Sequence, residues 1–259
     1  MVDQGRVLVT GAASGLGRHC YEAFRAVPYT RETNHALLLE EAKANPFDVI
    51  IHAAFNARPN IDTKNLNAYL SDTTFLTQKL LTIPHKKFIF ISSVDVYPKD
   101  DQAHHEDEVI RLNEVDGIYP ISKLISENMV SASGNQPLIL RPTAMLGPYA
   151  KPNSLMKILH HDCVSLTLAS QSTFNYIRHD DVSDFIQHAI HHQLNGIFNV
   201  AASSDLQLGE VSKHFNKPAT FGNYVYKTAN ADNHKISALF PCFKRTSMDN
   251  IKLYMNDIK

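Results

Sequence analysis

The amino-acid sequence predicts an α/β fold in which helices cover both faces of a doubly wound parallel sheet. Short apolar runs of strand length alternate along the chain with segments whose apolar residues recur every three or four positions. A glycine-rich turn joins the first run to the first helical segment. The 259 residues, 44% of them apolar, are enough to bury one such core. We therefore expect one compact unit with a smaller region packed over the carboxyl edge of the sheet.

Each strand is expected from a β-branched or continuously apolar run, and each helix from its spacing and its stop signals. Pro28, Pro46 and Pro84 close the first three helical segments, and the YTR after Pro28 is long enough only for the stub of a strand. The expected order is strand 6–10, helix 15–27, strand stub 29–31, helix 35–44, strand 47–54, helix 66–81, strand 87–93, helix 121–132, strand 137–142, helix 177–192 and strand 196–202.

Bulk composition excludes several classes of partner. A formal net charge of -1 gives no electrostatic attraction to nucleic acid or to an anionic membrane, so small molecules are the expected partners. Cys20, Cys163 and Cys242 are odd in number and lack metal or redox spacing, which indicates reduced thiols and a cytoplasmic protein. No apolar run reaches the length of a membrane span, and the start of the chain has no apolar signal core.

The turn TGAASGLG, residues 10–17, predicts a dinucleotide site of the Rossmann type. Glycines at Gly11, Gly15 and Gly17 would let a pyrophosphate reach the free N–H groups at the start of the helix, and Ala13, Ser14 and Leu16 share that backbone. About twenty residues beyond the first glycine, where an acidic residue usually binds the ribose hydroxyls, the chain has Arg31. An arginine suits a 2′-phosphate, so NADP is favoured over NAD, although the adjacent Glu32 keeps NAD open.

The stretch YPISK places Tyr119 and Lys123 four residues apart, on one face of a helix. A free phenol is a poor base at neutral pH, but a neighbouring cation and an oxidised nicotinamide both favour the phenolate and would lower the pKa of Tyr119. Ser93 ends the strand 87–93, where a doubly wound sheet places its ligands. We expect Tyr119 to move a proton, Ser93 to orient the substrate oxygen, and Lys123 to tune the phenol and bind the nicotinamide ribose.

With these residues, the chain resembles the extended short-chain dehydrogenase/reductase superfamily, which contains sugar-nucleotide epimerases, dehydratases and reductases. The motifs that carry the resemblance occur in order from TGAASGLG through DVIIHAA, ISSVDVYP, YPISK, RPTAMLGP and YIRHDDVSDFI to GIFNVAA. It implies that Ser93, Tyr119 and Lys123 are the catalytic residues, that Ala53 and Ala54 line the cofactor, and that Arg141 lies near the nicotinamide. It also implies a homodimer formed through two helices, one of which bears Tyr119.

The resemblance also implies a division of the chain into a dinucleotide-binding part, residues 1–147 and 179–202, and a substrate-binding part, residues 148–178 and 203–259. Some positions depart from the family pattern. Asp95 stands alone where dehydratases have an Asp-Glu pair, so it is expected to contact the substrate together with Ser93 and Tyr119. Asp72 replaces a common asparagine. Phe174-Asn175 occupies the place of an arginine that binds a diphosphate, which leaves a nucleotide-linked sugar open.

Two functional hypotheses follow. The first is an NAD(P)-dependent epimerase or ketoreductase that transfers hydride at a secondary alcohol or ketone of a sugar. The second is a catalytically silent dinucleotide-binding regulator or sensor with the same fold, against which the complete Ser93, Tyr119 and Lys123 set argues. No metal is expected, because the histidines of HAIHH, residues 188–192, have no carboxylate or cysteine cluster beside them.

Overall fold

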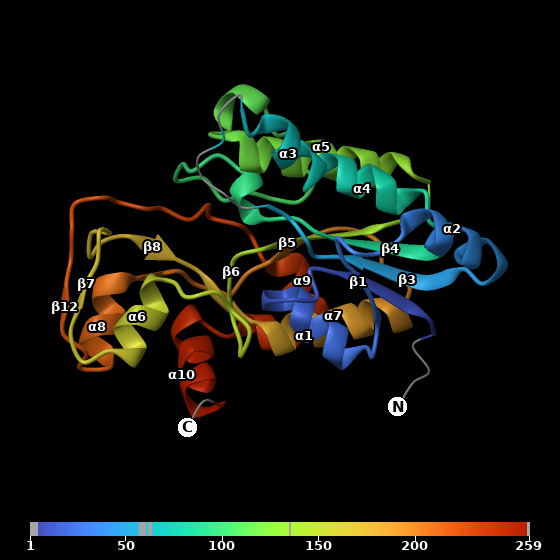
Figure 1. Ribbon diagram of the computed structural model, residues 1–259. Coiled ribbons are helices and arrows are strands. Elements are labelled where there is room, and N and C mark those ends of the chain that lie inside the picture. The colour runs from blue at the N-terminus through green and yellow to red at the C-terminus, as the bar shows by residue number, and fades with distance from the viewer. Residues whose placement is uncertain (1–4, 57–60, 62–63, 135, 258–259) are drawn as a thin grey trace.

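A six-stranded parallel sheet forms the centre of the computed structural model, which describes residues 5–56, 61, 64–134 and 136–257 (Figure 1). The order across the sheet is β10-β5-β4-β3-β1-β2, and each neighbouring pair is parallel. The strands are β1 (Val7–Thr10), β2 (Val27–Tyr29), β3 (Phe47–His52), β4 (His85–Ile91), β5 (Leu138–Pro142) and β10 (Gly196–Val200). The predicted doubly wound parallel sheet is confirmed.

Helices pack on both faces of this sheet because successive side chains of each strand point to opposite sides. Val7 and Val9 of β1 join the core beneath α1 and α7, whereas Leu8 joins the core shared with α2, α4 and α5. Figure 1 shows α1 and α7 on one side of the sheet and α4 and α5 on the other. The helices are α1 (Gly15–Ala23), α2 (His35–Ala44), α4 (Thr74–Leu81), α5 (Ile118–Ala132) and α7 (His179–His191).

The strand order reverses at β1, which lies between β2 and β3. The connections after β1 and after β3 therefore leave in opposite directions, and a crevice opens between the carboxyl ends of these two strands. Ligands of doubly wound sheets bind at this switch point. The glycine turn follows β1 directly, so the fold places it at the crevice.

The bounds of α1 and of the edge strand β2 differ from those that the sequence pattern predicts. Helix α1 ends at Ala23 rather than near Val27, because Val27 pairs with Leu8 in the three-residue strand β2. Pro28 is tolerated there since β2 is an edge strand. Residues 24–46, all of which the structure describes, hold only β2 and α2, which agrees with the short strand and the single helix expected there.

The helix expected over residues 66–81 is divided in two. Helix α3 (Leu66–Ser71) ends at Asp72, and α4 begins at Thr74. The backbone leaves helical geometry at Thr73, which has ψ of -95°, and its buried hydroxyl donates to the carbonyl oxygen of Tyr69. The break directs Asp72 towards the loop that follows β2.

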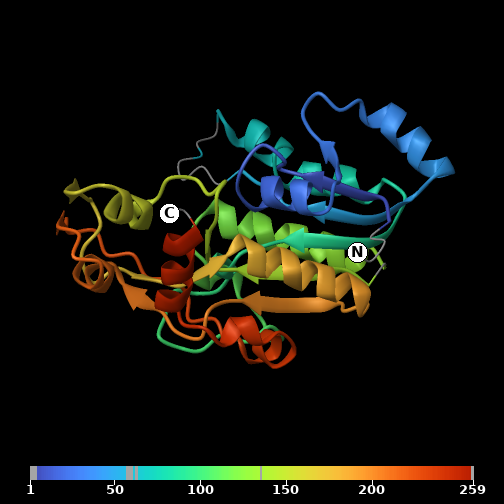
Figure 2. The ribbon, with the colours of Figure 1, turned by 90° about the horizontal axis from the view of Figure 1, so that it is seen from below.

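A second layer of structure, with its own apolar core, lies beyond the carboxyl edge of the sheet (Figures 1 and 2). Three helices surround this core together with three short strand pairs, β6 with β9, β7 with β12 and β8 with β11. These elements are β6 (Ala144–Leu146), α6 (Ser154–His160), β7 (Val164–Ser165), β8 (Thr173–Phe174), β9 (Tyr176–Arg178), β11 (Leu206–Gln207), α8 (Leu208–His214), β12 (Ala219–Thr220) and α10 (Ser247–Asp257).

An extended segment, residues 221–233, runs from β12 to α9 (His234–Leu239) and is called the strap here (Figure 1). Its backbone is hydrogen-bonded at one end to residues 167–173 and at the other to His104. Ala229 and Ala231 pack against Val94, Val96 and Tyr97, which follow β4. The strap therefore connects the second layer with the loop that follows β4.

Candidate active site

The turn between β1 and α1 is tight because glycine occupies its most crowded positions. Gly11 has φ of +78°, and a Cβ there would lie 3.0 Å from the backbone nitrogen of Ala54. A Cβ on Gly17 would overlap the carbonyl group of Gly11. The start of α1, the end of β1 and the residues after β3 thus approach as closely as a dinucleotide turn requires.

Within this turn the predicted cofactor residues have different surroundings. Ala13 and Ser14 are exposed, whereas the side chain of Leu16 is buried in the core, so Leu16 offers only its backbone. The first turn of α1 contains no acidic residue, as an anion site requires. The N–H group of Gly15 donates to the carbonyl oxygen of Tyr149 at 2.6 Å, so one amide of the turn is already paired.

Buried polar contacts fix the neighbouring end of β3. The hydroxyl of Thr10 accepts from the N–H of Ala54 at 2.9 Å and lies 2.8 Å from Nδ1 of His52. The other ring nitrogen of His52 lies 3.0 Å from the hydroxyl of Thr77. Burial, with the charge of Lys123, lowers the pKa of His52 to about 3, so the ring is neutral. Ala53 and Ala54 are held beside the glycine turn by this network.

Arg31 lies at the outer end of the crevice, after β2. Its guanidinium pairs with the carboxylate of Asp72 at 3.0 Å, and the Arg31 side chain is 87% exposed. The amide nitrogen of Asn56 lies 3.5 Å from the same Asp72 oxygen. The structure thus brings Arg31, predicted as a phosphate-binding residue, against an acidic partner from the end of α3.

Ser93, Tyr119 and Lys123 come together at the carboxyl end of β4. Ser93 caps the short 3₁₀ turn Val94–Val96, and its hydroxyl accepts from the N–H of Asp95 at 3.1 Å. Lys123 is 2% exposed and extends from α5 to the carbonyl oxygen of Ile91, the last residue of β4, at 2.6 Å. Its Nζ lies 5.8 Å from the centre of the Tyr119 ring.

The pKa of Tyr119 differs from the sequence expectation. Burial raises it, and the charge of Asp95 raises it further, while the hydroxyl of Ser93 acts in the opposite direction. In the protein without coenzyme the pKa of Tyr119 is thus raised, and the lowering expected beside an oxidised nicotinamide stays a prediction. Burial lowers the pKa of Lys123 itself to about 7, against the effect of Glu127, and its Nζ is directed at a carbonyl rather than at the phenol.

Arg141, predicted near the nicotinamide, is 3% exposed and ion-paired with Glu127. Two of its nitrogens reach the two Glu127 oxygens at 3.0 and 2.7 Å, and the third donates to the hydroxyl of Tyr97 at 2.6 Å. Ser92 also donates to Glu127. The guanidinium is thus fully engaged inside the protein, and a coenzyme contact by Arg141 stays a prediction.

Sequence reasoning missed Phe55 and Tyr226. The ring of Phe55 lies 3.8 Å from Nζ of Lys123 and meets the Tyr119 ring edge to face. Its place directly after Ala53 and Ala54 could have signalled this. Tyr226 lies on the strap, and its hydroxyl is 3.3 Å from Asp95, a contact across 131 residues that no local pattern announces.

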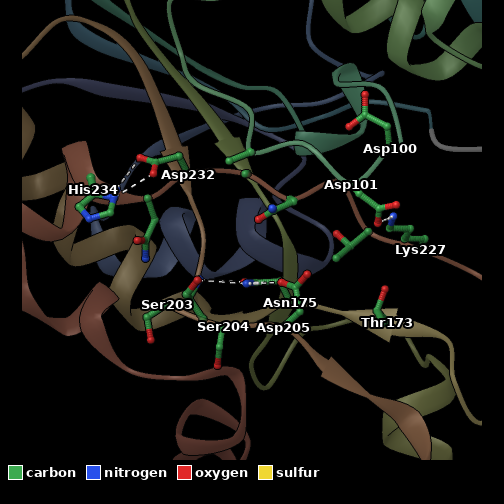
Figure 3. A pocket seen from close by; sticks show the side chains of 16 residues that line it. Asp100, Asp101, Thr173, Asn175, Ser203, Ser204, Asp205, Lys227, Asp232 and His234 are labelled. Carbon is green, nitrogen blue, oxygen red and sulfur yellow. Dashed lines mark hydrogen bonds and ion pairs between the residues drawn. The ribbon is translucent and has the colours of Figure 1, made fainter.

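A cavity of about 390 Å³ lies between the strap, the loop after β4 and the loop after β10 (Figure 3). Asn175, at the position where the family pattern has arginine, lies on its wall and donates to Asp205 at 2.9 Å. Asp101 pairs with Lys227, and Asp232 with His234. The polar side chains at this cavity thus include one ion pair, Asp101 with Lys227, and one carboxylate–imidazole contact, Asp232 with His234.

Arg178 and the histidines of HAIHH have ordinary structural partners. Arg178 pairs with Asp180 and Asp257. The histidines of α7 stack on one another, with 4.2 Å between the ring centres of His188 and His192. Across the described residues, no group of histidine, cysteine and acidic side chains has the arrangement of a metal site. None of the helices in the described part of the chain is long and apolar enough to span a membrane.

Comparison with known proteins gives one family and one fold. The model of the NAD dependent epimerase/dehydratase family matches residues 7–201. No curated protein sequence matches the chain significantly.

Among solved structures, dTDP-4-dehydrorhamnose reductase from Bacillus anthracis str. Ames, in complex with NADP, has a TM-score of 0.80 at 16% identity, over 98% of this chain and 99% of that one. UDP-glucuronic acid 4-epimerase from Bacillus cereus, in complex with UDP-glucuronic acid and NAD, has a TM-score of 0.76 at 20% identity, over 98% of this chain and 100% of that one. MoeE5, in complex with UDP-glucose and NAD, has a TM-score of 0.76 at 17% identity, over 98% of this chain and 100% of that one. At these identities the likeness establishes the shared fold.

Proposed function

The chain belongs to the NAD dependent epimerase/dehydratase family, and from this premise we propose that it is an NAD(P)-dependent epimerase or ketoreductase acting on a nucleotide-linked sugar. The observation that carries the proposal is the meeting of Ser93, Tyr119 and Lys123 at the carboxyl end of β4, beside the turn of Gly11 to Gly17. The nucleotide-sugar class is supported by the names of the solved structures that share the fold.

The residues around the crevice fit a nicotinamide dinucleotide. A Cβ would block the turn at Gly11 and at Gly17, so this backbone is shaped for close approach. We assign the pyrophosphate to residues 11–17, the adenosine side to Ala53 and Ala54, and the nicotinamide ribose to Lys123, with Arg141 as a further candidate. When bound, the coenzyme supplies or accepts the hydride.

Tyr119 is the proton donor in this proposal. As hydride reaches the carbonyl carbon of a keto-sugar, the Tyr119 hydroxyl gives its proton to the oxygen, which becomes the alcohol, and the phenolate left behind is reprotonated from solvent. Ser93 donates a hydrogen bond to the same oxygen and orients the carbonyl. The cation of Lys123 stabilises the transient phenolate.

The raised pKa of Tyr119 fits the role of proton donor in the protein without coenzyme. A phenol whose pKa lies above its ordinary value keeps its proton at neutral pH, so it begins the cycle as an acid. Oxidation of an alcohol, with which an epimerase begins, needs the phenolate. A bound oxidised coenzyme would lower the same pKa, so net ketone reduction and epimerisation both remain within this proposal.

The paired Arg31 and Asp72 bear on the choice of coenzyme. Arg31 supports the preference for NADP, since its guanidinium is a ligand for a 2′-phosphate. Asp72, 3.0 Å away, already neutralises part of that charge and would repel a phosphate. NADP stays the favoured coenzyme in this proposal, with Asp72 as the residue that limits the preference.

We assign substrate binding to residues 148–178 and 203–259 and coenzyme binding to residues 1–147 and 179–202. The separate apolar core of α6, α8 and α10 supports this division. A homodimer is also proposed, through α4 and α5, on whose surfaces Phe75 and Ile125 are 52% and 44% exposed. Sedimentation of the purified protein tests the dimer.

The test of the proposed function is coenzyme-dependent turnover. The purified protein should oxidise NADPH or NADH in the presence of a UDP- or dTDP-linked keto-sugar, and mass spectrometry of retained small molecules should find a nicotinamide dinucleotide. Tyr119→Phe should reduce kcat by about 10² to 10⁴-fold while the dissociation constant of the coenzyme stays unchanged. If coenzyme binds but neither protein turns over any keto-sugar of the panel, the chain is a silent dinucleotide-binding protein.

A further inference from the structure

We propose that Tyr226, on the strap, is a positioning residue of the active site. Its hydroxyl holds the carboxylate of Asp95 so that the hydroxyl of Ser93 is free to bind the substrate oxygen. The inference rests on the proposed roles of Ser93 and Tyr119.

Asp95 is shared among three groups, two of them close to it in the sequence and one on the strap. Its Oδ1 accepts from the hydroxyl of Tyr226 at 3.3 Å and lies 3.2 Å from Nζ of Lys99. Its Oδ2 lies 3.4 Å from the Ser93 hydroxyl, which can donate to it. One carboxylate therefore has a tyrosine and a lysine on one oxygen and the proposed substrate-orienting serine on the other.

Tyr226 is held firmly enough to position a partner. Its ring stacks on Phe174 with 4.7 Å between centres, and Nζ of Lys99 lies 4.4 Å over the same ring. Its backbone nitrogen donates to the Ser172 hydroxyl, and its carbonyl oxygen accepts from the N–H of Thr173 at 2.9 Å. The phenol thus has a fixed ring, a fixed backbone and one polar partner.

The hydroxyl groups of Ser93 and Tyr226 and the ammonium group of Lys99 compete as donors to the carboxylate of Asp95. A carboxylate with few donors is a strong acceptor and would retain the Ser93 proton in a charge-assisted hydrogen bond. Donation from Tyr226 and Lys99 spreads this charge towards Oδ1, so Ser93 can turn its O–H to a substrate carbonyl at lower cost.

The same carboxylate faces both tyrosines. The charge of Asp95 raises the pKa of Tyr119 and that of Tyr226, in each case after the larger effect of burial. Tyr226 and Tyr119 therefore both feel the charge of one anion, and a change at Tyr226 reaches both proposed substrate-binding hydroxyls through it.

The substitution Tyr226→Phe isolates the hydroxyl, because phenylalanine keeps the ring stack on Phe174 and the contact with Lys99. We expect kcat to fall about tenfold, the size of one hydrogen bond to a charged group, with KM changed less than kcat and coenzyme affinity unchanged. Tyr224→Phe is the matched control, since Tyr224 lies two residues away on the strap and is 66% exposed; its activity should equal that of the unaltered protein.

A double-mutant cycle with Asp95→Asn separates positioning from a general structural role. If Tyr226 acts through Asp95, Tyr226→Phe should lower kcat less than about twofold further in the Asp95→Asn background. Equal losses in both backgrounds, or full activity of Tyr226→Phe alone, would overturn the inference.

Thermal unfolding provides a readout that does not depend on turnover. Tyr226→Phe should lower Tm by about 2 °C in the unaltered background and by less in the Asp95→Asn background. If the unaltered protein shows no turnover, but the Tm effects of Tyr226→Phe and Asp95→Asn depend on one another, the result would count against the proposed function. If the protein turns over, but the effects of the two substitutions on kcat and Tm are independent, the result would count against the role of Tyr226.

Discussion

At the scale of single residues, Lys123 is a cation that the fold buries at a cost. Its pKa is lowered to about 7 by burial, whereas the unfolded chain has a lysine of ordinary pKa. Between these values the unfolded state binds a proton that the folded state does not, so stability rises as pH increases through this window. The penalty below it is on the order of a few kcal/mol. Such a cost is understandable if Lys123 serves the chemistry.

We predict that Lys123→Met abolishes turnover yet leaves Tm at pH 7 equal to or above that of the unaltered protein. The reason is that methionine removes the buried charge and keeps the volume. The variant should also lose part of the rise in Tm between pH 7 and pH 9. Thermal unfolding at both pH values measures this, and a fall in Tm at pH 7 with an unchanged pH dependence would contradict it.

For the buried ion pair of Arg141 and Glu127 we predict the opposite effect, a loss of stability when one charge is removed. Arg141→Met should lower stability by about 3–5 kcal/mol, because Glu127 would be left charged and unpaired inside the protein. Glu127→Met in the same chain should restore much of the loss. Chemical denaturation measures both, with Arg111→Met as the control, since Arg111 is in a surface pair that is mostly exposed. Weakened coenzyme binding in the folded double variant would instead support the predicted coenzyme contact.

At the scale of elements, two glycine substitutions separate the effect of close backbone packing from the effect of backbone conformation. Gly17→Ala should prevent coenzyme binding and lower Tm, because its Cβ would meet the backbone of Gly11. Gly134→Ala is the comparison, since Gly134 has φ of +79° but nothing within 4 Å of its Cβ, and it should cost only about 1 kcal/mol. Coenzyme titration and thermal unfolding compare the two variants. Equal effects on Tm, with coenzyme bound by both, would remove the argument that close approach requires Gly17.

We predict that the contact between the β2–α2 loop and the end of α3 sets the choice between NADP and NAD. Asp72→Asn should shift the ratio of dissociation constants towards NADP by about tenfold, because it removes a carboxylate from beside Arg31. Arg31→Ala should shift the ratio in the opposite direction. Fluorescence titrations with NADPH and NADH measure both ratios. Unchanged ratios in both variants would show that these residues lie outside the adenosine ribose site.

At the scale of the whole molecule, Asn199 connects the sheet, the loop after β4 and the strap. Its side chain is fully buried and donates to the carbonyl oxygens of His104 and Asp232, each at 3.0 Å, and accepts from Tyr97 at 2.8 Å. Because β10 is an edge strand, this one amide attaches both segments to the sheet.

We predict that Asn199→Ala lowers stability by about 2–4 kcal/mol, since it removes a donor to the carbonyl oxygens of His104 and Asp232 and the buried acceptor of the Tyr97 hydroxyl. The strap should become more susceptible to limited proteolysis than any other segment, and kcat should fall even under conditions where the protein stays folded. Asn195→Ala, near the opposite end of β10 and exposed, is the control. Proteolysis that spares the strap in Asn199→Ala would contradict this role.

The sequence alone determined the doubly wound parallel sheet and the glycine turn. These follow from patterns within a few residues: the apolar runs of β3, β4 and β5 are buried on both faces, and Gly11 and Gly17 meet backbone that a neighbouring strand must bring close. The spacing of Tyr119 and Lys123 likewise follows from the geometry of one helix.

The tertiary structure decided which groups these residues contact. The pairing of Val27 with Leu8 ended α1 early, burial directed Lys123 to Ile91, and the fold joined Arg141 to Glu127 and Tyr226 to Asp95. The physical reason is that pKa and hydrogen-bond partners depend on desolvation and on groups far away in the chain, whereas a sequence pattern reports only on neighbours along the chain.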